Sequence, residues 1–150
     1  MGTWRLAIVQ DDPTIIELCL GLYREDPSPE PVDANNISRT LAMFRAEPAR
    51  GKAVVLEVDG RVVGYSLLAS FWSNELGGAT CVIDELYVAP PFRSMGYSSA
   101  LVAALRQGKL WGERPIALCL EVTPSNSRAL GLYKRLGFEG KNLNLRLPLG

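Results

Sequence analysis

Arg93, Gly96 and the residues that follow them have the types and spacing to bind an anion. Gly96 lies between a strand-like apolar run and a helix-like apolar run, so a helix is expected to begin directly after it. The first N–H groups of a helix have no partner within the helix and lie at the positive end of its dipole. Together with the guanidinium of Arg93, they predict a site for a phosphate-bearing cofactor.

A strand and a helix are expected to position this site. Residues 83–88 are apolar and rich in β-branched or aromatic side chains, as in a buried strand, and Pro90 and Pro91 end it because proline cannot donate to a ladder. From Tyr97 to Gln107 the pattern is that of an amphipathic helix. Its apolar stripe consists of Ala100, Leu101, Ala104 and Leu105.

A second segment, residues 126–138, also reads as a helix with chemistry on one side. Asn126 is a typical N-cap residue, and Gly137 is typical of the position that ends a helix. At roughly 100° per residue, Asn126, Ala129 and Tyr133 fall along one side of this helix. The pattern therefore predicts an amide and a phenol along one groove. The alternative is that Asn126 only caps the helix and Tyr133 is an aromatic side chain of the core.

The first segment resembles the acyl-CoA-binding stretch of the GNAT N-acetyltransferase family. That family has the pattern Q/R-x-x-G-x-G/A after a strand, and this chain has Arg93, Gly96 and Ser98 at the three defined positions. Ser98 stands where Gly or Ala is usual, and Ser94 stands where Gly is common. The resemblance extends over about residues 54–138 and is much weaker before them.

The second segment resembles the downstream helix of the same family in Asn126, Ala129, Tyr133 and the closing Gly-Phe. The resemblance implies the GNAT acyl-CoA N-acyltransferase fold: α/β, with a mixed, mostly antiparallel central sheet, a splayed parallel strand pair and flanking helices. It implies acetyl-CoA as cosubstrate. The cofactor-binding residues that it implies are Leu86, Tyr87, Val88, Arg93, Ser94, Met95, Gly96, Tyr97, Ser98, Ser99, Asn126, Ala129 and Tyr133.

The implied reaction is acyl transfer to a primary amine by direct attack in a ternary complex. Tyr133 is the expected proton donor to the leaving thiolate, and a backbone N–H near Tyr87 or Val88 is expected to polarise the carbonyl. Glu85 is the expected base, acting directly or through water. Asp84 points to the opposite face of an ideal strand, and either acid could instead pair with a basic side chain. Glu121 is the reserve candidate for the base.

The acceptor is expected to be a small cationic amine, polyamine-like or aminoglycoside-like, with a protein N-terminus or lysine second. The acidic loop over residues 25–36, which carries four acids, and the aromatic pair Phe71 and Trp72 are candidates for the acceptor side. A non-catalytic acyl-CoA sensor or interaction module is the alternative class. A nucleotide-binding regulator is disfavoured because the pattern G-x-x-x-x-G-K-[ST] is absent.

The remaining elements complete a single domain over residues 1–150. A helix from Asp12 to about Arg24 is expected between the first strand and the acidic loop, and the connection over residues 71–80 is expected to be turn-rich. The crossover helix makes the strands at 83–88 and 116–122 parallel. The tail from Phe138 to Leu147 is short for the final hairpin that the GNAT resemblance implies, so the last strand is expected to be truncated or completed by a second subunit, as in a homodimer. Other expected elements are strands over 4–9, 53–58, 62–70 and 143–147, and a helix over 37–46.

Composition excludes several classes of function. The net charge of zero over 150 residues gives no electrostatic case for a nucleic acid or an anionic membrane. No apolar run approaches the ~18 residues of a membrane span, and no leader pattern is present, so the cytoplasm is the expected compartment. No histidine is present, and no metal site is expected. The three cysteines read as buried thiols rather than as a disulfide framework.

Overall fold

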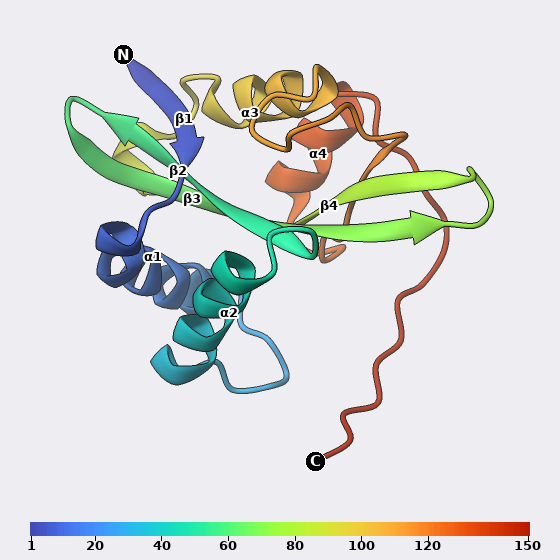
Figure 1. The fold of residues 1–150 in the computed structure, drawn as a ribbon, viewed down its shortest axis with the longest axis horizontal. Coiled ribbons are helices and arrows are strands. Elements are labelled where there is room, and N and C mark those ends of the chain that lie inside the picture. Colours follow the sequence, from blue (N-terminus) through green and yellow to red (C-terminus); the bar gives the residue numbers. More distant parts are fainter.

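The computed structural model describes residues 1–150 as a five-stranded sheet with helices on both faces (Figure 1). The strands are β1 (Gly2–Leu6), β2 (Gly51–Val58), β3 (Arg61–Ser73), β4 (Gly78–Val88) and β5 (Leu118–Leu120). The helices are α1 (Asp12–Glu25), α2 (Ala34–Ala46), α3 (Tyr97–Arg106) and α4 (Ser127–Arg135). None of them is long and apolar enough to cross a bilayer.

The strands follow chain order in the sheet, β1-β2-β3-β4-β5. Neighbours are antiparallel up to β4, and β4 and β5 run parallel. The mixed, mostly antiparallel sheet and the helical crossover through α3 are therefore confirmed. Asp59 and Gly60, with φ of 50° and 76°, form the tight turn expected between β2 and β3.

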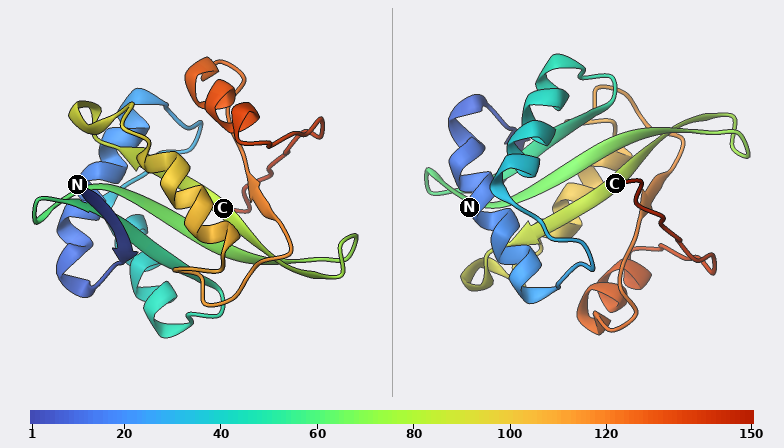
Figure 2. Two further views of the ribbon diagram at one scale, coloured as in Figure 1. Left: turned by 90° about the horizontal axis from the view of Figure 1, so that it is seen from above. Right: turned by 90° about the horizontal axis from the view of Figure 1, so that it is seen from below.

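Helices α1 and α2 cover one face of the sheet, and α3 covers the other (Figures 1 and 2). Alternation along the strands supplies both cores, because Val54 of β2 packs toward α3 and its neighbour Val55 packs toward α1. The core under α1 and α2 contains Ile15, Cys19, Ile37, Leu41, Val55, Tyr65, Leu67 and Tyr87. The core under α3 contains Val54, Leu68, Cys81, Ile83, Leu101, Val102, Leu105 and Trp111.

A β-bulge at Asp84 interrupts this alternation in β4. Leu67 of β3 is opposite Glu85 while Leu68 is opposite Ile83, so Asp84 is the extra residue. Ile83 therefore packs under α3, whereas Glu85 contacts α1 even though both have odd numbers. Strict alternation therefore fails between Ile83 and Glu85, which lie two residues apart but face opposite sides of the sheet. The bulge decides which face of the sheet receives the carboxylate of Glu85.

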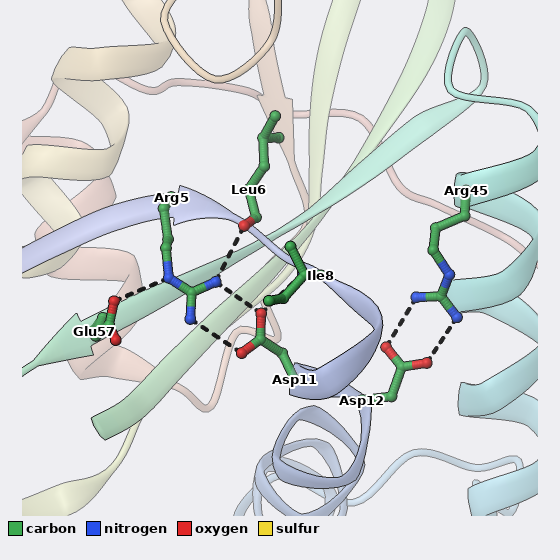
Figure 3. A network of polar contacts seen from close by, with 7 residues as sticks. All are labelled: Arg5, Leu6, Ile8, Asp11, Asp12, Arg45 and Glu57. Carbon is green, nitrogen blue, oxygen red and sulfur yellow. Dashed lines mark hydrogen bonds and ion pairs between the residues drawn. The ribbon is translucent and has the colours of Figure 1, made fainter. Parts of the chain in front are cut away.

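Beside the sheet, ion pairs join β1 to the start of α1 (Figure 3). Arg5 binds both carboxylate oxygens of Asp11, at 2.7 and 3.0 Å, and reaches Glu57 of β2 at 3.0 Å. Arg45 of α2 binds Asp12 in the same two-oxygen manner, at 2.7 and 2.9 Å. These pairs fix the entry of α1 against β1, β2 and α2.

Several element boundaries differ from the sequence prediction. No strand forms over residues 143–147, where the leucines are more than four-fifths exposed. Strands β3 and β4 extend to Ser73 and from Gly78, so most of the expected turn at 71–80 is hairpin. Helix α2 begins earlier, at Ala34, because the Asp33 side chain accepts from the N–H of Asn36 at 2.8 Å. The expected strand over 116–122 is limited to β5, and β1 ends before Ala7.

The cysteines are free, but only two of them are buried. Cys19 and Cys81 lie in the two cores, and burial raises the pKa of both thiols to about 12. Cys119 is exposed on β5, which corrects the expectation of three buried thiols.

Candidate functional site

A cleft of about 660 Å³ lies at the carboxyl end of β4, bordered by α1, α3 and α4. The residues singled out in the two sequence motifs meet there, although some thirty residues separate the motifs in the chain. Those that line the cleft are Leu86, Tyr87, Val88, Arg93, Ser94, Gly96, Tyr97, Ser98, Ser99, Asn126, Ala129 and Tyr133. Met95 is exposed and does not line it.

The free edge of β4 forms the floor of the cleft. Strands β4 and β5 pair only over Cys81–Ile83 and Leu118–Leu120, and the bulge at Asp84 follows directly. Beyond it, β3 still pairs with β4, and the N–H of Ala89 donates to Val63 of β3. Because backbone groups alternate in direction along a strand, the N–H groups of Leu86 and Val88 point away from β3. They are free donors on the cleft side.

The loop before α3 supplies a second set of free donors. Gly96 is the N-terminal cap of α3 with φ of 81°, and no side chain caps the helix. The first amide bonded within the helix is that of Ala100, which donates to Gly96, so the amides of residues 97–99 are left for a ligand. Ser94 also has positive φ, 63°, a conformation that glycine adopts more readily. The indole of Trp4 donates to the Tyr97 carbonyl at 2.8 Å and holds the helix start.

The side chain of Arg93 is already engaged within the protein. Its Nε donates to the Val88 carbonyl at 2.7 Å, and its Nη2 contacts Glu25 of α1 at 2.6 Å. The guanidinium also lies 5.2 Å from the centre of the Tyr87 ring. Arg93 therefore fixes the turn that presents the backbone amides, and its Nη1, which has no partner within the protein, remains a donor beside them.

Helix α4 forms the opposite wall. The Asn126 side chain caps it by accepting from the N–H of Ala129 at 3.3 Å. Tyr133 lines the cleft, and its ring packs edge-on against Phe138 with 5.7 Å between ring centres. No protein group binds its hydroxyl, and burial raises the pKa of this phenol above its usual range. Tyr133 therefore remains a proton donor at neutral and moderately alkaline pH.

The C-terminal end of α1 forms a wall of the site that the sequence did not predict. Leu22, Glu25 and Asp26 line the cleft, and Asp26 accepts from the Thr123 hydroxyl at 3.3 Å. The acids were expected on the acceptor side, but Glu25 faces Arg93 of the α3 loop instead. No local pattern marks these positions, because only the packing of α1 across β4 brings them to the cleft.

Glu85 does not line the cleft but lies under α1, one residue before Leu86. Its Oε1 accepts from the Tyr65 hydroxyl at 2.7 Å and from the Cys19 thiol at 3.4 Å, and its Oε2 accepts from the Tyr23 hydroxyl at 2.5 Å. Burial and the adjacent Glu85 carboxylate raise the pKa of both phenols, so both are donors. No basic side chain pairs with Glu85.

The other predicted candidates lie elsewhere. Glu121 is exposed and accepts a hydrogen bond from Asn144. Phe71 and Trp72 lie at the tip of the β3–β4 hairpin, about two-thirds exposed, and Trp72 borders a separate hollow beside Gly78 and Ile116. Neither aromatic lines the cleft.

Comparisons with known proteins agree with this geometry. A sequence model of the acetyltransferase (GNAT) family matches residues 15–138. An uncharacterized N-acetyltransferase of Methanocaldococcus jannaschii is 37% identical over 91 residues, which are 59% of this chain and 39% of that protein. An N-alpha-acetyltransferase of Sulfurisphaera tokodaii is 36% identical over 91 residues, 57% of this chain and 54% of that protein. The match thus spans about half or less of the length of these relatives.

Among solved structures, a possible acetyltransferase from Clostridium difficile 630 superposes with a TM-score of 0.81. The superposition covers 99% of this chain and 97% of that chain, at 21% sequence identity. At this identity the likeness establishes the fold alone. It confirms the α/β fold that the two sequence motifs implied.

Proposed function

The chain belongs to the acetyltransferase (GNAT) family, and from this premise we propose that it transfers the acetyl group of acetyl-CoA to a primary amine. One observation carries the proposal. Free amides of β4, free amides at the start of α3 and the unbonded hydroxyl of Tyr133 all face one cleft. These are the donors needed to polarise a thioester, bind a diphosphate and protonate a thiolate.

Acetyl-CoA fits the residues that line the cleft. The amides of Tyr97, Ser98 and Ser99 would hold its diphosphate, because they are uncapped and lie at the positive end of α3. A Cβ at Gly96 would meet no protein atom within 4 Å, so the loop is open at this position. Asn126 and Ala129 would border the extended arm of the cosubstrate. The bound cosubstrate supplies an activated acyl thioester.

The proposed mechanism gives each step to a group of this chain. Glu85 takes a proton from the acceptor ammonium through water, which frees the nitrogen lone pair for attack. The Leu86 and Val88 amides stabilise negative charge that develops on the carbonyl oxygen. As the carbon–sulfur bond breaks, the attacking nitrogen loses its second proton to solvent, and Tyr133 gives its proton to the sulfur and recovers one from solvent. The net change is one amide formed, one thioester cleaved and one proton released.

A small cationic amine, polyamine-like or aminoglycoside-like, is the proposed acceptor. Partial desolvation, and then the charges of Glu85 and Glu121, raise the pKa of Asp84 near the bulge. Arg146 opposes this shift but does not cancel it, and a group of carboxylates favours a cationic partner. A protein N-terminus is the second candidate, because the relative from Sulfurisphaera tokodaii is named an N-alpha-acetyltransferase.

The proposal includes a cytoplasmic, homodimeric enzyme. Free thiols without disulfides suit a reducing compartment. Leu143, Leu145 and Leu147 alternate with polar residues and are more than four-fifths exposed, so a second copy could cover them. Sedimentation of the purified chain at several concentrations tests the dimer.

Release of free thiol from acetyl-CoA tests the activity. Three acceptor panels are compared: polyamines and aminoglycosides, peptides with a free N-terminus, and N-terminally blocked peptides that contain lysine. We expect the first panel to give the fastest release above hydrolysis. Faster release with the second panel would show that the acceptor is a protein N-terminus instead of a small amine. Binding of acetyl-CoA with no release in any panel would favour a non-catalytic acyl-CoA-binding module.

A further inference from the structure

The carboxylate of Glu85 is held by three donors, which come from α1 and β3. A carboxylate has about four acceptor directions, two on each oxygen. Tyr65 and Cys19 occupy both directions of Oε1, at 2.7 and 3.4 Å. Tyr23 occupies one direction of Oε2, at 2.5 Å. One acceptor direction of Glu85 therefore remains, and it belongs to Oε2.

The three donors differ in exposure. Tyr65 is fully buried and Cys19 is 1% exposed, so Oε1 faces the core. Tyr23 is only partly buried, and it marks the side of the carboxylate that solvent can approach. The bulge at Asp84 causes this arrangement, because it turns Glu85 toward α1 and away from α3.

On the basis of the proposed function, we propose that Tyr23 is the positioning residue of the base. By holding Oε2 from one direction, it aims the remaining lone pair of this oxygen at the acceptor. The proton of the ammonium moves to Oε2, directly or through one water, and the nitrogen keeps the electron pair with which it attacks. Tyr65 and Cys19 orient the carboxylate from the core but do not face this lone pair.

Two variants that each remove one tyrosine hydroxyl separate these roles. Tyr23→Phe removes the donor to Oε2, and Tyr65→Phe removes a donor to Oε1. We expect Tyr23→Phe to lower kcat about tenfold while the KM for acetyl-CoA stays within about twofold. Tyr65→Phe should mainly lower the melting temperature, because it leaves an acceptor in the core short of a partner.

Repeating Tyr23→Phe in a Glu85→Gln protein distinguishes an effect on the position of the carboxylate from a general effect on folding. If Tyr23 acts through the carboxylate, Tyr23→Phe should cause no further loss of kcat once Glu85 is Gln. An equal tenfold loss in both backgrounds would overturn the inference, as would an unchanged kcat in Tyr23→Phe alone.

A spectroscopic readout keeps the inference testable if no amine is acetylated, an outcome that would refute the proposed function. Protein labelled with carbon-13 at the glutamate carboxyls gives a signal for Glu85, identified by its loss in Glu85→Gln. We expect Tyr23→Phe to move this signal, and Glu17→Gln, on the exposed face of α1, to leave it in place. An unmoved signal in Tyr23→Phe would show that Tyr23 does not hold the carboxylate.

Discussion

Arg128, in the first turn of α4, donates to the hydroxyl of Ser94, in the loop before α3, at 3.1 Å. Each residue belongs to one of the two sequence motifs, and each lines the cleft. The hydrogen bond therefore joins the two walls of the site. Both side chains are exposed, so the bond is free to exchange for a contact with a bound anion.

Arg128→Ala should weaken acetyl-CoA binding about three- to tenfold, because it removes a cation beside the amides of α3. The loss should shrink as ionic strength rises. Arg106→Ala, an exposed arginine at the far end of α3, is the matched control and should leave the affinity unchanged. Equal affinities of the natural protein and both variants at low salt would show that Arg128 does not contribute to acetyl-CoA binding.

Tyr133→Phe should lower kcat about 100-fold and leave acetyl-CoA binding nearly intact, since the phenol acts on the leaving sulfur. Burial raises the pKa of Tyr133, and the donor is the protonated form below that pKa. Activity of the natural protein should therefore persist as pH rises to about 10, the ordinary tyrosine value. A rate for Tyr133→Phe within twofold of the natural rate would exclude the phenol as the acid.

Asp11→Asn should destabilise the protein by about 2 kcal/mol at pH 7, because it removes the negative charge that faces Arg5 and one of the two oxygens that accept from it. The hydrogen bond from Arg5 lowers the pKa of Asp11, against the effect of burial and with help from the Ile8 amide. A lowered folded-state pKa stabilises the fold above the unfolded value of about 4, and the gain is lost as pH falls through the folded value.

Thermal unfolding from pH 7 to pH 2.5 measures this difference. The melting temperatures of the natural protein and Asp11→Asn should converge below about pH 4. Asp59→Asn is the control, because Asp59 is 87% exposed and its partner is the N-terminus at 3.9 Å. A difference that is constant across the pH range would contradict the ion-pair account.

Much of the fold follows from local patterns in the sequence. The Asp59-Gly60 turn, the strand that ends before Pro90 and the helix that begins after Gly96 are all encoded in neighbouring residues. The alternating leucines of residues 143–147 mislead for the same reason. They have the pattern of a strand, but no neighbouring strand pairs with them in this structure.

The site was harder to predict where it depends on long-range packing. Asn126 and Tyr133 could be placed on one side of α4 from the helical period alone. The partners of Glu85 could not, because a single-residue bulge at Asp84 reverses the faces of β4 and leaves no mark in the sequence. The ion pair between Arg93 and Glu25, which are 68 residues apart in the chain, likewise depends on how α1 crosses β4.

Calorimetric titration with acetyl-CoA tests the central claim most directly, with a matched pair of glycine variants. Gly96 and Gly77 have similar positive φ, 81° and 68°, and a Cβ at either meets no protein atom within 4 Å. Gly96→Glu and Gly77→Glu should therefore cause similar backbone strain, but only the first adds charge and bulk to the cleft. We predict one-to-one binding in the micromolar range that Gly96→Glu abolishes and Gly77→Glu preserves. Equal binding by both variants, or no binding by the natural protein, would contradict the account.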